Sequence, residues 1–314
     1  MPYDHRKTAP RTLALALALA GCCAALAGCG ASQASEDAPA AGKAGTQAPP
    51  PAVNATPTAP DASATPATTA PSSSGSPSGS GQQESRSLAG RTVVVDPGHN
   101  PGNFRHSREI NAKVDIGTAR KECDTTGTST NGTASEAAYT EAAFTLDVSH
   151  RLRDLLTARG AKVVLTHDAD RPWGPCIDER AAIGNAARAD AVVSVHADGS
   201  AVGHRGFHVI LPARVSSGAA DTGAIVGPSR ELGKNIADHF ARATGTAPAN
   251  YLAGGTGLDV RKDLGGLNLS TVPKVFVECG NMRDPKDAAL LTSAAWRQKA
   301  ARGMADGIAT YLNG

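Results

Sequence analysis

The sequence of 314 residues has little net charge and no long hydrophobic run. Its apolar stretches are all shorter than the ~18 residues of a lone membrane-spanning helix, so we expect no such span. The formal net charge at pH 7 is only +2, without the concentrated basic excess that usually marks a nucleic-acid-binding protein. We therefore expect no nucleic-acid partner.

Bulky hydrophobic side chains are almost missing from residues 31–88. This stretch has no aromatic residue, and Val53 and Leu88 are its only hydrophobic residues other than alanine. Such a composition cannot bury enough apolar surface to offset the entropy lost on ordering, so we predict a disordered linker over residues 30–88. The remaining residues, 89–314, are enough for one globular domain with a substantial core.

Residues 1–29 have the three parts of a secretory signal: a basic start, an apolar centre and small residues at the end. The end, Leu-Ala-Gly-Cys at residues 26–29, resembles the lipobox of bacterial lipoproteins, whose cysteine is acylated. Cys22 ends a second match, but cleavage there leaves a short apolar core, so Cys29 is favoured. The alternative is an ordinary cleaved signal. Both interpretations place the domain outside the cytoplasm, and the first anchors it to the outer face of the cytoplasmic membrane by lipid alone.

Three cysteines remain in the predicted domain. Cys123 and Cys176 lie in segments rich in glycine, threonine and proline, which are typical of loops, whereas Cys279 ends an apolar strand. Disulfides persist outside the cytoplasm. We therefore predict a Cys123–Cys176 disulfide and one buried free thiol at Cys279.

Short apolar strands alternate with amphipathic helices through the domain, which predicts an α/β fold with helices on both faces of one sheet. Residues 100–138 are polar and indicate a long loop, or a loop that includes a hairpin. The predicted strands are centred on residues 93–95, 163–165, 191–195, 207–211 and 275–277. Helices are predicted from Thr140 to a stop at Gly160, over a short stretch through Ile183, and over a stretch that ends near Gly245. A last helix has Ala300, Met304, Ile308 and Leu312 facing the core.

Three of these strands end in a side chain that can bind metal or carry a proton. His99 follows the first strand, His196 follows the third and Glu278 ends the fifth, and sites in such sheets gather beyond the carboxyl ends of the strands. Two histidines with one carboxylate would satisfy a catalytic zinc and leave a fourth position for water. Glu136 and Glu141 are both candidates for that carboxylate, although a glutamate in the first turn can also simply favour the helix dipole.

Four motifs occur in a specific order between about Arg91 and Leu312. They are the strand ending in Gly98-His99, Glu141 in Glu-x-x-Phe-x-Leu-x-Val, Ser194-Val195-His196-Ala197, and Val277-Glu278-Cys279-Gly280-Asn281. Together they resemble the zinc-dependent N-acetylmuramoyl-L-alanine amidases of the type-3 family. Residues 174–180 and 263–269 look most like the stand-alone mycobacterial members.

The resemblance implies a single mixed, mostly parallel sheet with helices on both faces, a zinc-exopeptidase-like amidase domain. It implies that His99, Glu141 and His196 hold one Zn²⁺, with Glu141 preferred to Glu136, and that Glu278 is the catalytic glutamate. The implied reaction is hydrolysis of the amide between N-acetylmuramic acid and the L-alanine of peptidoglycan or of soluble muropeptides. The alternatives are a catalytically silent wall-binding or activator protein, and a zinc peptidase acting on stem peptides.

Further expectations concern residues around these four. Arg261, Asn268 and Asn281 are expected to contact the substrate, and the protein is expected to be a monomer. Asn100 and Asp198 are close enough in sequence to the two histidines to be considered as partners that orient their rings. Two departures from the family pattern, His167 in place of arginine and Cys279 in place of leucine, involve no expected ligand.

Overall fold

The computed structural model describes residues 87–130 and 138–314. The predicted signal segment, Cys22 and Cys29, the predicted linker up to residue 86, and Glu136 lie outside these described residues. Within the described ranges, no helix is both long enough and apolar enough to cross a membrane.

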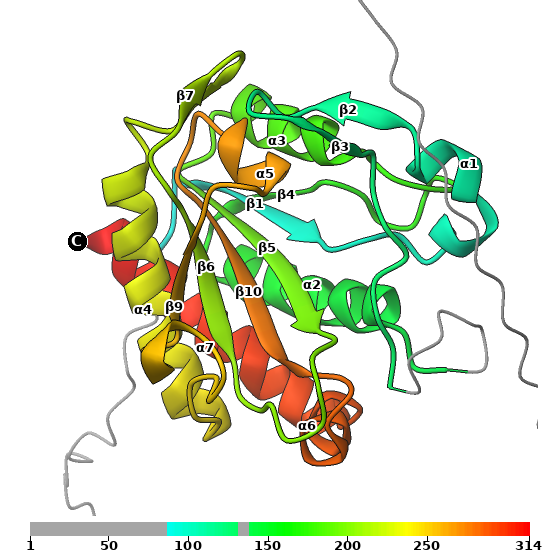
Figure 1. Ribbon diagram of the computed structural model, residues 1–314. Coiled ribbons are helices and arrows are strands. Elements are labelled where there is room, and N and C mark those ends of the chain that lie inside the picture. Colours follow the sequence, from blue (N-terminus) through cyan, green and yellow to red (C-terminus); the bar gives the residue numbers. More distant parts are fainter. Residues whose placement is uncertain (1–86, 131–137) are drawn as a thin grey trace, which may run out of the picture. The chain divides into compact units, whose positions relative to one another are not determined.

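A six-stranded sheet forms the centre of the domain, with strand order β4-β1-β5-β10-β6-β9 (Figure 1). Neighbouring strands are parallel except for β10 and β6, which are antiparallel. The prediction of a mixed, mostly parallel sheet is therefore confirmed. The strands are β1 (Thr92–Pro97), β4 (Lys162–Leu165), β5 (Ala191–Asp198), β6 (His208–Pro212), β9 (Leu258–Arg261) and β10 (Lys274–Asn281).

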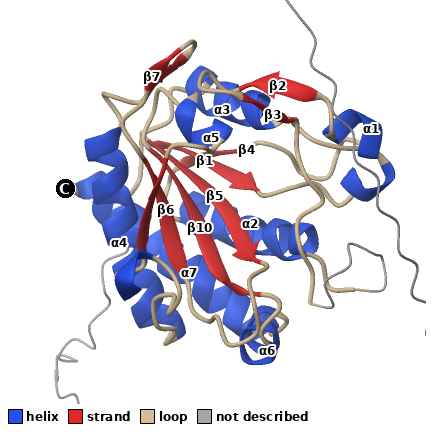
Figure 2. Cartoon of the chain, viewed as in Figure 1, coloured by secondary structure: helices blue, strands red, loops and turns tan. Residues whose placement is uncertain are grey.

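Helices cover both faces of the sheet, as predicted, but unequally (Figure 2). On one face α2 (Glu141–Ala158), α4 (Val226–Thr244) and α7 (Ala294–Asn313) pack on the large apolar core, to which each central strand contributes alternate residues. On the other face α3 (Ile177–Ala186) covers a small cluster around Val94, Ala189 and Val192. The side chains of His196 on β5 and Glu278 on β10 lie on this second face, since their neighbours Val195 and Val277 face the large core.

The polar segment over residues 100–138 is predicted to be a long loop or a loop that includes a hairpin, and the structure has the hairpin. Its strands are β2 (Lys113–Asp115) and β3 (Arg120–Glu122), preceded by a 3-10 turn (Asn103–Arg105) and by α1 (Ser107–Ile110). Several short elements were not predicted. They are β7 (Ser216–Ser217), β8 (Ala220–Asp221), a 3-10 turn (Ala253–Gly255), β9, α5 (Gly265–Asn268) and α6 (Pro285–Leu291).

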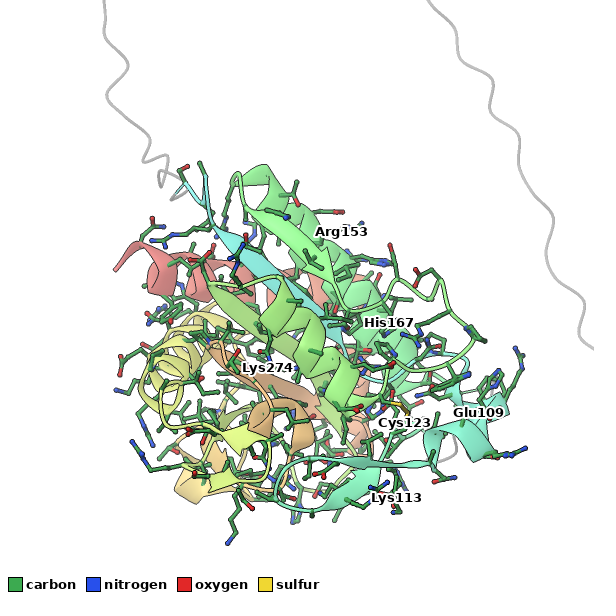
Figure 3. All side chains as sticks on the ribbon, turned by 90° about the horizontal axis from the view of Figure 1, so that it is seen from above. Glu109, Lys113, Cys123, Arg153, His167 and Lys274 are labelled. Atoms are coloured by element: carbon green, nitrogen blue, oxygen red, sulfur yellow. A yellow bond between two sulfur atoms is a disulfide. The ribbon has the colours of Figure 1, made fainter. Side chains whose placement is uncertain are left out.

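The predicted disulfide is present. Cys123, labelled in Figure 3, directly follows β3 and is bonded to Cys176, the residue that caps the N-terminus of α3. The bond therefore ties the long polar segment to the thinly covered face of the sheet. Cys279 is a buried free thiol in the large core, also as predicted.

Candidate metal centre and active-site cleft

Three side chains from three different elements converge at the carboxyl end of the sheet. His99 follows β1, His196 lies on β5, and Glu141 is the first residue of α2. One ligand atom of each lies within 4.8 Å of the other two, and these residues form a group that could hold a metal ion. Oε1 of Glu141 contacts both histidines, since it lies 3.1 Å from Nε2 of His99 and 3.0 Å from Nδ1 of His196.

Two glycines give these side chains the room they need. A Cβ atom at Gly98 would overlap the imidazole ring of His196. A Cβ atom at Gly127 would lie 2.7 Å from Oε2 of Glu141 and 2.8 Å from Cδ2 of His99, and Gly127 also has a φ of +71°, which side chains other than glycine rarely adopt. Any larger residue at either position would displace a member of the cluster.

Glu141 is fixed by the start of its helix and by backbone donors. Thr140 caps α2 by accepting a hydrogen bond from the amide of Ala143 at 3.2 Å. The carboxylate of Glu141 accepts hydrogen bonds from the amides of Thr128 (2.9 Å) and Ala197 (3.2 Å). Burial alone would raise the pKa of Glu141, but the facing histidines outweigh it and hold the pKa well below its usual value. The side chain is therefore an anion at neutral pH.

The ring of His99 is oriented by residues that the sequence analysis did not single out. Nδ1 of His99 lies 3.1 Å from the carbonyl oxygen of Thr125 and 3.5 Å from Oδ1 of Asp124. These contacts direct Nε2 toward Glu141. Burial disfavours the charged ring, but the carboxylates of Glu141 and Asp124 raise the pKa of His99 well above its usual value.

The two residues considered for this orienting role make other contacts. The side-chain amide of Asn100 donates to the carbonyl of Gly174 at 2.8 Å, and Oδ2 of Asp198 accepts a hydrogen bond from the hydroxyl of Tyr251 at 2.6 Å. Sequence proximity to a histidine did not identify its partner, because Asp124 follows His99 only after α1 and the β2–β3 hairpin.

A buried group of charged side chains adjoins the cluster through Asp124, which contacts His99. The guanidinium of Arg180 donates to Asp96 at 2.8 Å and to Asp124 at 2.9 Å, and the ammonium of Lys274, labelled in Figure 3, donates to Asp96 at 3.2 Å. Burial alone would raise the pKa of Asp96, yet the two cations hold it far below its usual value. Alternation along β10 offered one signal for this group: Lys274 falls on the same face as Glu278.

Glu278 stands beside the cluster without belonging to it. It pairs in register with His196 across β10 and β5, so the two side chains lie next to each other on one face. Both residues line a cleft of about 300 Å³. Oε2 of Glu278 is buried and accepts no hydrogen bond among the described residues. Burial, followed by the charges of Glu141 and Asp198, raises the pKa of Glu278 well above its usual value.

The structure treats the three expected substrate contacts differently. Arg261 lines the cleft, with its guanidinium held by Asp263. Asn268 is buried and donates to Thr118 and to the carbonyl of Lys262, and Asn281 is buried among backbone groups of residues 200–204 and 283. Asn268 and Asn281 therefore hold loops in place, and the structure does not bring them to the cleft.

Comparison with known proteins identifies the family. Residues 93–310 match the sequence profile of the N-acetylmuramoyl-L-alanine amidases, and this range covers more than half of the chain. The chain belongs to this amidase family. The match begins in β1 and ends in α7, so it includes every element that contributes to the cluster and the cleft.

Relatives of this amidase include a mycobacterial protein and two solved structures. It is 40% identical over 228 residues to the N-acetylmuramoyl-L-alanine amidase Rv3717 of Mycobacterium tuberculosis. The aligned residues cover 72% of this chain and 88% of that relative. The Ami1 amidases of Mycobacterium smegmatis and Mycobacterium abscessus are each 40% identical with a TM-score of 0.64, and the matches cover 72% of this chain and 99% and 100% of theirs. The resemblance inferred from the four motifs is confirmed, and the amidase is a hydrolase.

Proposed function

We propose that this amidase uses one zinc ion, held by His99, Glu141 and His196, to hydrolyse the amide between N-acetylmuramic acid and L-alanine in peptidoglycan. The observation that carries the proposal is the convergence of one ligand atom from each of the three residues within 4.8 Å, beside Glu278 and open to a cleft. Two imidazole nitrogens and one carboxylate oxygen form a donor set typical of catalytic zinc.

The residues present fit such an ion. Glu141 is anionic, and its Oε1 lies 3.1 Å from Nε2 of His99 and 3.0 Å from Nδ1 of His196. This oxygen and these two nitrogens would hold the ion. Bound zinc supplies a Lewis acid that polarises a carbonyl group and lowers the pKa of water. The contacts of Asp124 and Thr125 with His99 would fix which ring nitrogen faces the ion.

Glu278 would carry the protons of the reaction. It lines the cleft and is outside the metal-binding group, so its carboxylate remains available to accept a proton from water at Oε1 and to return it to the departing amine. Burial and two neighbouring carboxylates raise the pKa of Glu278, which makes its carboxylate a stronger base for this proton transfer. Arg261 at the cleft wall is proposed to contact the substrate.

The protein is proposed to act outside the cytoplasm as a monomer, anchored through a lipid on Cys29. The disulfide supports an oxidising compartment. Replacement of Cys29 by alanine should release the protein from the membrane or block its processing, as followed by fractionation and immunoblotting. If Cys22→Ala alone has this effect, Cys22 is the modified residue.

Mass spectrometry of digested muropeptides tests the reaction. The zinc-loaded protein should yield free stem peptides that begin with L-alanine, together with N-acetylmuramic acid that carries no peptide. Chelation should abolish both products, and added zinc should restore them. Shortened stems still attached to the sugar would instead indicate a peptidase, and unchanged muropeptides would indicate a silent wall-binding protein.

A further inference from the structure

Three polar side chains form a row across adjacent strands of the sheet. Glu278 on β10 pairs with His196 on β5 on one side and with His208 on β6 on the other. Directly paired residues project to the same face with Cβ atoms about 4.5–5.5 Å apart. Glu278 therefore stands between a histidine of the metal-binding group and a second histidine to which neither the family motifs nor the proposed reaction assigns a role.

His208 is buried, and one of its two ring nitrogens lacks a hydrogen-bond partner among the described residues. Its side chain is 3% exposed, and its Nδ1 has no hydrogen-bond partner among the described residues. The same holds for Oε2 of Glu278. In this structure the two atoms are not hydrogen-bonded to each other. A buried polar atom without a partner costs free energy, and a rotation of either side chain that joins these two atoms would satisfy both.

The residues around His208 keep its ring neutral, so that one ring nitrogen carries a proton that it can donate to Glu278. Burial lowers the pKa of His208, and the positive charge of Arg261 lowers it further. The carboxylates of Asp198 and Asp259 raise it, but by less. The ring is therefore neutral at pH 7 and carries one N–H group to donate. Asp198 already accepts the hydroxyl of Tyr251, whose ring meets His208 edge-on with centroids 6.2 Å apart.

We propose that His208 is a positioning residue for Glu278, with its Nδ1–H donating to Oε2 so that Oε1 is directed into the cleft. The inference rests on the proposed proton transfer by Glu278. His208 is absent from the described residues that line the cleft, so it acts through Glu278 and touches no substrate. It is also outside the metal-binding group identified among the described residues.

Three substitutions at one position test this role. Asparagine can place an N–H group near the position of Nδ1, glutamine places the same amide about where Nε2 lies, and leucine fills the space without a donor. We expect His208→Leu to lower kcat for muropeptide hydrolysis by about 10- to 100-fold, the range for a lost hydrogen bond to a charged group, with KM unchanged. His208→Asn should recover most of kcat, and His208→Gln should not. Zinc content and thermal melting of each variant are measured alongside.

The outcomes separate this inference from the proposed function. A wild-type protein that leaves muropeptides intact would refute the proposed function itself. An active wild type with kcat within two-fold in His208→Leu would overturn the role of His208 alone, and so would a loss of zinc in that variant. An equal loss of kcat in the asparagine and leucine variants would overturn the inference, because it would show that His208 acts by packing against Tyr251. If His208→Leu does not fold, the asparagine and glutamine variants decide, and equal kcat in these two would overturn the inference.

Discussion

Two glycines, Gly98 and Gly127, make room for the ligands of the metal centre. Gly127 lies against both Glu141 and His99, and Gly98 lies against His196. The centre is built by close approach of backbone to side chain, because Glu141 must reach the histidines while two backbone amides hold its carboxylate. A substitution that leaves every ligand intact can therefore still disrupt the site.

Replacement of Gly127 by alanine tests this close packing. The new Cβ atom would overlap Glu141 and His99 and would also occupy a backbone conformation with positive φ, so zinc occupancy and hydrolysis should both fall. Gly203→Ala is the matched control: Gly203 has a φ of +90° but no atom within 4 Å of the added Cβ. The control should lose about 1–3 kcal/mol of stability through strain and keep its zinc, as measured by denaturation and metal analysis. Full zinc occupancy in Gly127→Ala would contradict the account.

At this scale the sequence predicted the centre better than its surroundings. His99, His196 and Glu278 stand at the ends of predicted strands, where pattern fixes position. Pattern leaves Glu141 and Glu136 as alternatives, and the resemblance to the amidases favours Glu141. Asn268 and Asn281 are expected to contact the substrate, but their side chains donate to neighbouring loops, and the sequence does not show which way a side chain points. The sequence does not reveal Asp124 as the partner of His99, because the β2–β3 hairpin brings the two together and no local pattern encodes that contact.

Among the elements, the segment between β1 and α2 depends most on a covalent tie. It has few buried apolar residues, and the Cys123–Cys176 bond joins it to α3 next to Asp124, the partner of His99. The disulfide therefore supports both the stability of the segment and the orientation of a metal-binding side chain.

A double substitution, Cys123→Ser with Cys176→Ser, should lower the free energy of unfolding by roughly 4 kcal/mol, because a long loop is no longer closed in the unfolded chain. It should also weaken zinc binding, measured by competition with a chelator, since Asp124 then loses the covalent tie of its neighbour Cys123 and is held only by hydrogen bonds such as that from Arg180. A reducing agent should reproduce both effects in the wild type and leave the double variant unchanged. A reduced wild type with unaltered stability would show that the bond is dispensable.

The strands that the sequence predicts are those with apolar runs, which are buried in β1, β5, β6 and β10 and partly buried in the edge strand β4. β9 was not predicted because Leu258 and Val260 alternate with Asp259 and Arg261 in a strand of four residues at the sheet edge. The α6 helix was not predicted although Asp284 caps it and Pro285 begins it, because it is a single short stretch with little periodicity. Short polar elements are determined by what they pack against, which local sequence does not encode.

Over the whole molecule, buried charge should make stability depend on pH. Asp96 carries a negative charge between Arg180 and Lys274, so its pKa in the folded protein lies far below the roughly 3.9 of an unfolded chain. Its contribution to stability is complete above the unfolded value and is lost as the pH falls below it, toward the folded pKa.

We expect the free energy of unfolding of the metal-free protein to fall as the pH drops from about 4 toward 2, with up to ~1.4 kcal/mol per pH unit from this one group. Asp96→Asn should remove that part of the slope. Asp190→Asn is the control, since Asp190 pairs with Arg91 at the surface and should leave the slope as in the wild type. Urea titrations at a series of pH values measure the slopes, and identical slopes in the wild type and Asp96→Asn would refute the assignment.

The division of labour between the metal ligands and Glu278 is tested by zinc content and hydrolysis measured on the same preparations. Glu278→Gln keeps the size of the side chain and removes its basic carboxylate, so zinc should stay near one per chain while hydrolysis falls by ~10²–10⁴-fold. His196→Ala removes a ligand, so zinc occupancy, activity and melting temperature should fall together. Loss of zinc from Glu278→Gln, or full activity in that variant, would contradict the account.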